Sequence, residues 1–266
     1  MLDQIFDNLL LLGLAQAAAT SALALAVVLL GRFQNVHLER ETLVALARGF
    51  VQVVAVGSVL LLLLQGPNWT SVFVLAAMMV VAAGISSRRA QGIPGAFWVS
   101  LQSIGMGAGL VIGLMTLLGV IEAKLTALIP VGSMVIAAAM RANGLALDRF
   151  RAEIIAHAGQ IEAALALGAE PNATVSGEVG VAIQASLIPS LDSLRSLGIV
   201  WIPGLMSGMV LSGSDPVYAA IYQFVVIVMI FAVGGLTAVP GVLAMRSRVF
   251  SPAQQLILRP GEEDEG

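Results

Sequence analysis

Apolar residues in this chain gather into seven long runs that are separated by short polar connections. A bilayer core of about 30 Å needs roughly 20 apolar residues per helix, and each run comes near that length. We place the predicted spans at residues 9–30, 43–65, 69–87, 96–119, 125–146, 194–213 and 216–245. The pattern therefore predicts an all-helical, multi-pass membrane protein with about seven transmembrane helices.

Composition agrees with a chain that sits in the lipid bilayer. Hydrophobic residues make up 58% of the sequence and charged residues 11%, whereas a soluble domain averages about 25% charged residues. The chain has no cysteine, which excludes disulfides and thiolate metal sites. We expect residues 1–258 to form one transmembrane domain, and the acidic residues 259–266 to form a disordered tail.

The first run is best interpreted as a span of the mature protein, because Asp3 and Asp7 precede it where a secretory signal would carry Lys or Arg. Basic residues then set the orientation, since cytoplasmic connections are enriched in Lys and Arg. With seven spans, every arginine falls on one side and the single lysine, Lys124, on the other. We therefore predict an outside amino terminus, a cytoplasmic carboxyl terminus and a location in the cell (inner) membrane.

The longest interval between spans, at residues 147–192, is then cytoplasmic. Ile154, Ala158, Ile161 and Leu165 recur at helical spacing, which predicts an amphipathic helix. Gly168 suits the left-handed position that ends a helix, and the proline at position 171 cannot continue one.

This helix contains Glu162-Ala163-Ala164, three residues and Gly168, followed by Ala169 and Pro171. The pattern EAAxxxG resembles the coupling motif of ABC-transporter permeases, in which a short cytoplasmic helix docks into a cleft on the ATPase subunit. The downstream half of the importer motif does not keep its usual spacing here, because Ile188 and Pro189 come too late.

A longer resemblance covers most of the chain, and it is to the FetB-type permease family, the membrane half of an iron-exporting ABC transporter. Plant aluminium-tolerance permeases are related to that family. The matching positions are Arg48, Gln52, Gly57, 167–169, Pro171, 187–189, Asp192, Ser193, Gly198, Asp215, Pro216, Tyr222, Gln223 and, most specifically, Pro203-Gly204-Leu205-Met206-Ser207-Gly208.

The resemblance implies a homodimeric permease that exports iron or another metal ion, driven by a separate ATPase subunit that binds ATP and Mg²⁺. It also implies candidates for the translocation pathway or its hinges, namely Arg48, Gln52, Pro189, Asp192, Pro203, Gly204, Met206, Ser207 and Gly208. One departure concerns the cargo. Where the family tends to have Gly-Asn-Ala-Met, this chain has Ala137, Ala138, Ala139 and Met140, so the substrate here could differ.

Several polar or flexible positions have simpler structural roles. We expect Asp215 to cap the last span, and Asp192 to pair with Arg195 or cap the sixth span. Gly105, Gly109 and Gly113 form a smooth face for helix packing, within the subunit or across a dimer. The methionines are typical of gap-filling in apolar helices, and the sequence shows no dedicated metal cage.

Missing motifs narrow the function further. The chain has no GxxxxGK phosphate loop and so cannot supply the ATPase, and it has no HExxH metalloprotease motif. It also lacks a basic patch for nucleic acid. The main alternative to the ABC permease is a stand-alone secondary transporter driven by an ion gradient, which would favour ionisable residues deep in the spans and an internal repeat.

Overall fold

The computed structural model describes residues 9–32, 39–64 and 66–258, and the predicted acidic tail lies outside them. Within these ranges the only regular secondary structure is helical, apart from two isolated β-bridges. The chain divides into two compact units, residues 1–66 and 67–266.

The first unit consists of α1 (Leu9–Arg32) and α2 (Glu39–Leu64), which pack against each other. Both helices are long and apolar enough to cross a membrane, and none of the residues in their apolar windows is buried within the protein. A helix that is apolar all round without protein cover needs lipid or another helix around it.

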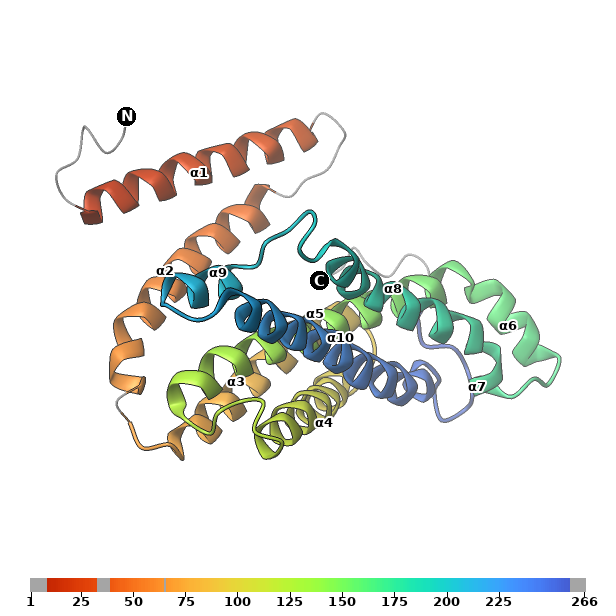
Figure 1. Ribbon diagram of the computed structural model, residues 1–266. Helices are drawn as coiled ribbons and strands as arrows, with labels where there is room; N and C mark the ends of the chain where they lie inside the picture. Colours follow the sequence, from red (N-terminus) through yellow and green to blue (C-terminus); the bar gives the residue numbers. More distant parts are fainter. Residues whose placement is uncertain (1–8, 33–38, 65, 259–266) are drawn as a thin grey trace. The chain divides into compact units, whose positions relative to one another are not determined.

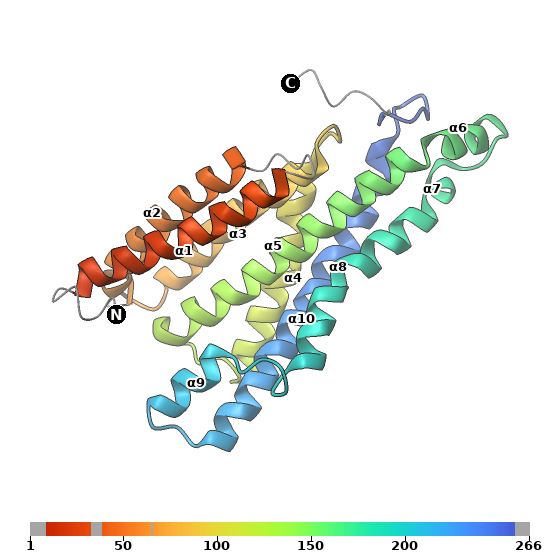
Figure 2. The ribbon, with the colours of Figure 1, turned by 90° about the horizontal axis from the view of Figure 1, so that it is seen from above.

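The second unit is a bundle in which five long helices run along one another (Figures 1 and 2). These helices are α3 (Thr70–Ser87), α4 (Ala96–Leu117), α5 (Leu125–Ala156), α8 (Ser176–Ser196) and α10 (Pro216–Arg246). The helices α5 and α10 form the centre, because they contact each other and both also pack against α4 and α8. Two short turns of 3₁₀ helix, η2 (Arg88–Ala90) and η3 (Ser247–Val249), follow α3 and α10.

Two apolar cores hold the bundle together. One core joins α3, α4 and the first halves of α5 and α10 around residues such as Ile104 and Val135, which are fully buried. The other core joins the far ends of α5 and α10 to α6 (Ala158–Ala166), the start of α8 and the segment after α10, around Phe150 and Ile154.

Glycine at position 107 sets how closely α4 approaches α10. A Cβ atom there would lie against the Thr237 hydroxyl and 3.1 Å from the Thr237 backbone nitrogen. The stripe of Gly105, Gly109 and Gly113 behaves differently, because a Cβ atom at any of these positions would meet no described atom within 4 Å. Within the second unit the close approach therefore depends on Gly107, and packing of the stripe across a dimer stays a prediction.

The structure has six helices in its described ranges that are long and apolar enough to span a membrane, rather than seven. The predicted helix at 194–213 is wrong, since α8 ends at Ser196 and α9 (Gly204–Leu211) has only 8 residues. Gly198 adopts a left-handed φ of +76°, and Pro203 lies just before α9. These two residues break the apolar run because neither supports a continuous helix there.

The helix α5 continues to Ala156 without a break, ten residues beyond the end of the predicted span at residue 146. A one-residue break at His157 leads into α6, so the predicted amphipathic helix is divided: Ile154 lies in α5, whereas Ala158, Ile161 and Leu165 lie in α6. The short helix α7 (Pro171–Thr174) follows. The predicted helix stop is confirmed, since Gly168 has a left-handed φ of +87° and Pro171 is the first residue of α7.

Candidate functional site

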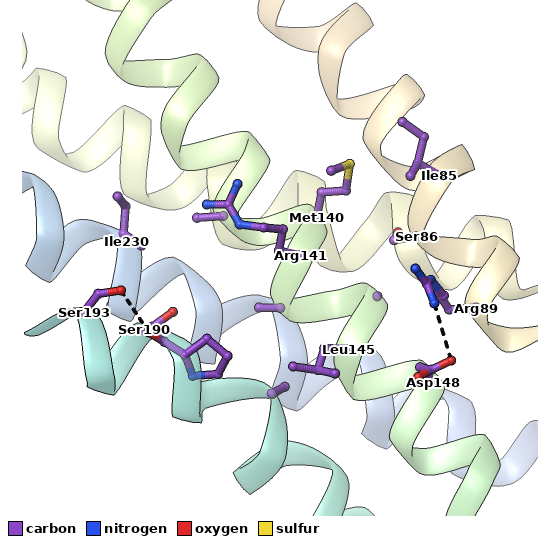
Figure 3. Close-up of a pocket in the computed structure, with 15 residues that line it drawn as sticks. Ile85, Ser86, Arg89, Met140, Arg141, Leu145, Asp148, Ser190, Ser193 and Ile230 are labelled. Carbon is purple, nitrogen blue, oxygen red and sulfur yellow. Dashed lines mark hydrogen bonds and ion pairs between the residues drawn. The ribbon is translucent and has the colours of Figure 1, made fainter. Parts of the chain in front are cut away.

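A cavity of about 440 Å³ lies among α3, α5, α8 and α10 (Figure 3). This volume falls within the range of roughly 300–1,000 Å³ that is usual for small-molecule sites. The lining combines apolar, hydroxyl and charged side chains, and it consists of Ile85, Ser86, Arg89, Ala138, Met140, Arg141, Ala142, Gly144, Leu145, Asp148, Ser186, Pro189, Ser190, Ser193 and Ile230.

The α5 wall carries most of the charge. Ala138, Arg141, Leu145 and Asp148 follow one another at spacings of three or four residues, which places them on one face of the helix. The guanidinium of Arg89 lies 4.0 Å from the Asp148 carboxylate (Figure 3), and both side chains are more than half exposed. Arg141 has no ion pair or hydrogen bond with any residue that the structure describes.

The α8 wall supplies hydroxyl groups. Ser186, Ser190 and Ser193 share one helix face, and the Ser193 hydroxyl donates to the Pro189 carbonyl at 2.9 Å. The Ser190 hydroxyl has no hydrogen-bond partner among the described residues. Pro189 has no N–H, so the carbonyl four residues earlier loses its helical donor and α8 can bend at this point.

A buried polar contact joins three helices beside the cavity. The Asn143 amide on α5 donates to the hydroxyls of Ser86 on α3 and Ser100 on α4, at 3.1 and 3.0 Å. All three side chains are almost fully buried. The side-chain oxygen of Asn143 faces α10, where a Cβ atom on Gly241 would come within 2.6 Å of it. The sequence analysis missed this residue, although an asparagine inside an apolar run is a signal for such a contact.

The structure places the predicted pathway residues in three regions. Pro189 lines the cavity, and the other candidates of the second unit do not. Asp192 instead pairs with Arg195 at 3.5 Å, which confirms the expected local ion pair. The candidates Pro203, Gly204, Met206, Ser207 and Gly208 lie at the start of α9, and Arg48 and Gln52 lie in α2 of the first unit.

Other polar and sulfur-containing residues have structural roles. The Asp215 carboxylate accepts the backbone N–H of Tyr218 at 2.9 Å, so it caps α10 as predicted. Met134 and Met140 pack against the core around Val135. Among residues 9–32, 39–64 and 66–258, no group of three or more His, Asp or Glu side chains could hold a metal ion.

The predicted coupling residues lie in and just after α6. This helix buries Ala158 and Ile161 against the core around Phe150 and leaves Glu162 and Ala163 exposed. Ala164 is half-buried, while Gly168 and Ala169 are exposed in the turn before Pro171.

An imidazole at the break before α6 connects this region to α8. His157 Nδ1 lies 3.6 Å from the Glu153 carboxylate on α5 and 3.4 Å from the Glu178 carboxylate on α8. Arg149 adds a contact of 2.8 Å to Glu153. These contacts place the His157 ring between α5 and the first turn of α8.

The six long apolar helices define a multi-pass membrane protein, and a cavity lined by apolar, hydroxyl and charged side chains lies among α3, α5, α8 and α10. The chain matches the model of the "Uncharacterised protein family (UPF0014)" over residues 14–250, and it belongs to this family. No solved structure matches it.

Three relatives show how far the similarity extends. The protein ALUMINUM SENSITIVE 3 of Arabidopsis thaliana is 30% identical over 92% of this chain and 90% of its own length. The "probable iron export permease protein FetB" of Escherichia coli is 29% identical over 89% of this chain and 92% of its own. The UPF0014 membrane protein YjkA of Bacillus subtilis is 28% identical over 89% of this chain and 95% of its own.

Proposed function

We propose that this chain is the permease subunit of an ABC transporter and that a separate ATPase subunit drives it. The observation that carries the proposal is the match along 89% of the chain to a relative titled a probable iron export permease. The cavity between α3, α5, α8 and α10 offers a place for the cargo, and the chain has no nucleotide-binding motif of its own.

The ATPase subunit docks on α6 and the turn after it. This helix is short, lies beyond the bundle and exposes Glu162 and Ala163, and Leu167, the residue that follows it, is 90% exposed. Small exposed residues let another protein approach closely, and an exposed leucine gives that protein an apolar contact. ATP and Mg²⁺ bind to the partner, and two permease copies pair in the bilayer.

The end of the bundle that holds α6 faces the cytoplasm. There η2, the end of α5 and η3 come together in one core, and the segments around it carry arginines. Arg151 donates to the Gln91 carbonyl at 2.9 Å, and Arg248 to the Pro94 carbonyl at 3.4 Å. The only lysine, Lys124, precedes α5 at its other end. Apart from Arg195, which lies in the last turn of α8 at the end opposite α6, this asymmetry follows the positive-inside rule.

With this orientation we assign the sixth crossing to α8, in place of the predicted helix at 194–213, although α8 is more polar than the six helices that are apolar enough to span a membrane. It runs beside α5 and α10 from the α6 end of the bundle to the opposite end (Figure 2). Seven crossings then put the amino terminus outside and the carboxyl terminus in the cytoplasm. Cargo moves outward, and a metal ion such as iron is the cargo by analogy with the named relative.

Co-purification tests the proposal most directly. The tagged chain is purified gently from its native membrane, and stoichiometric companions are identified by mass spectrometry. We expect a companion with Walker motifs near one-to-one. A clean chain without such a companion, together with ion-gradient-driven flux in liposomes, would replace the proposal with a stand-alone secondary transporter.

A matched pair of glycine variants tests the docking site. Gly168 and Gly119 both have a left-handed φ, and each donates its N–H to the carbonyl three residues earlier. Proline cannot adopt a left-handed φ and has no N–H to donate. Gly168→Pro and Gly119→Pro therefore disrupt the same local geometry at opposite ends of the bundle. We expect Gly168→Pro to uncouple ATP hydrolysis from transport and Gly119→Pro to leave the coupling ratio unchanged. Equal coupling ratios in both variants would refute docking at α6.

A further inference from the structure

We propose that the cavity among α3, α5, α8 and α10 binds a solute through carboxylate or phosphate oxygens, and that Arg141 selects its charge. The anion is either the cargo itself or the ligand shell of a metal ion that crosses as a complex. This inference deepens the proposed function, because it takes the cavity to be where the cargo binds.

The charge of the cavity wall favours an anion. Its titratable side chains are Arg89, Arg141 and Asp148, so the lining carries one net positive charge. Asp148, the one carboxylate, already lies beside Arg89. A bare divalent cation would therefore meet an unpaired guanidinium and no free carboxylate, whereas hard cations need several oxygen ligands.

The hydrogen-bonding groups of the cavity point to the same class of ligand. A guanidinium presents planar donors that fit the two oxygens of a carboxylate or phosphate, and Arg141 has no competing partner among the described residues. The Ser190 hydroxyl on the facing helix is also without a described partner and can donate to the same anion. A ligand between α5 and α8 can thus receive donors from both walls.

The position of Arg141 ties it to the cavity wall of α5. It lies five residues before the end of the predicted span at residue 146, and it lines the cavity. Arg141 also lies three residues after Ala138, which lines the same cavity.

Direct binding to the purified chain in lipid nanodiscs tests the proposal without the ATPase subunit. The probes are radiolabelled citrate, inorganic phosphate, ferric citrate and free Mn²⁺, each measured by equilibrium dialysis. Arg141→Gln removes the charge from the cavity wall, and Arg88→Gln removes the same charge from a residue that is equally classed as exposed but does not line the cavity. We expect Arg141→Gln to weaken anion binding about tenfold or more, and Arg88→Gln to change it less than about twofold.

A second variant covers the case in which Arg141→Gln does not fold. Arg141→Lys keeps the charge but loses the planar fork, and we expect it to bind the anion with an affinity between those of wild type and Arg141→Gln. Binding of metal-free citrate or phosphate identifies an anionic cargo, and binding of ferric citrate alone identifies a metal complex.

Two results would overturn the anion site. One is binding of Mn²⁺ without binding of any anion, and the other is equal anion affinity in wild type, Arg141→Gln and Arg141→Lys. An ATPase companion missing from the purified complex would refute the proposed transporter class but would leave this binding result unaffected.

Discussion

Replacing Gly107 by alanine adds one methyl group at the crossing of α4 and α10. The new Cβ atom would lie 3.1 Å from the Thr237 nitrogen and 3.2 Å from the Leu236 carbonyl carbon, and it would also press on the Thr237 hydroxyl. Nonbonded carbon contacts are comfortable at about 3.5–4.0 Å, so α4 and α10 must separate by about half an ångström. Because two of the crowded atoms are backbone, a change of side-chain rotamer cannot relieve the contact.

The expected cost follows from this geometry. Overpacking a tightly fitted site costs about 1–3 kcal/mol. Alanine also has a higher helix propensity than glycine, by up to about 1 kcal/mol, and this gain in stability partly offsets the cost of overpacking. Gly109→Ala is the matched control, because it brings the same gain in the same helix and a Cβ atom there meets no described atom within 4 Å.

The free energy of unfolding, measured by SDS titration in mixed micelles, compares the two variants. We expect Gly107→Ala to be less stable than Gly109→Ala by about 1–3 kcal/mol. Equal stability of the two variants would refute the close packing of α4 on α10 and the burial of Thr237 against Gly107.

Two other changes test contacts at the ends and the centre of the bundle. Asn143→Ala removes the hydrogen bonds to Ser86 and Ser100. A hydrogen bond between membrane helices contributes about 0.6 kcal/mol on average and about 1.7 kcal/mol at most, so the variant should lower the free energy of unfolding by about 1–3 kcal/mol. An unchanged midpoint in the SDS titration would contradict this. Asp215→Ala leaves the Tyr218 N–H without its cap and should cost about 0.5–2 kcal/mol, whereas Asp215→Asn should retain most of the stability; equal losses in both would argue against capping.

Apolar run length predicted most of the membrane helices well. The runs at 96–119 and 216–245 correspond to α4 (Ala96–Leu117) and α10 (Pro216–Arg246), because a helix buried in lipid is defined by its composition alone. The predicted span in α5 ended at residue 146, ten residues before the helix itself ends at Ala156. Beyond residue 146 this helix is amphipathic, and it is held by packing of Phe150 and Ile154 that a hydropathy pattern does not contain.

The run at 194–213 shows a second limit of hydropathy. It is apolar throughout, yet its backbone turns at Gly198 and Pro203, so composition overestimated the helix. The cavity could be predicted only in part, since the family resemblance pointed to Pro189 but not to the arginine across from it. Arg141 was interpreted as one of the cytoplasmic arginines, and only the pairing of α5 with α8 shows that it lines a cavity.

The length of α5 has a mechanical consequence. Its 32 residues form one helix of about 48 Å, which carries the cavity residues midway along and ends at the His157 break. No loop interrupts α5 between Arg141 and that break, and the packing around Phe150 keeps this part of the helix rigid. If a bound protein displaces the His157 end of α5 by a few ångströms, the whole helix tilts as one rigid body. The cavity residues on α5 then move together with that end.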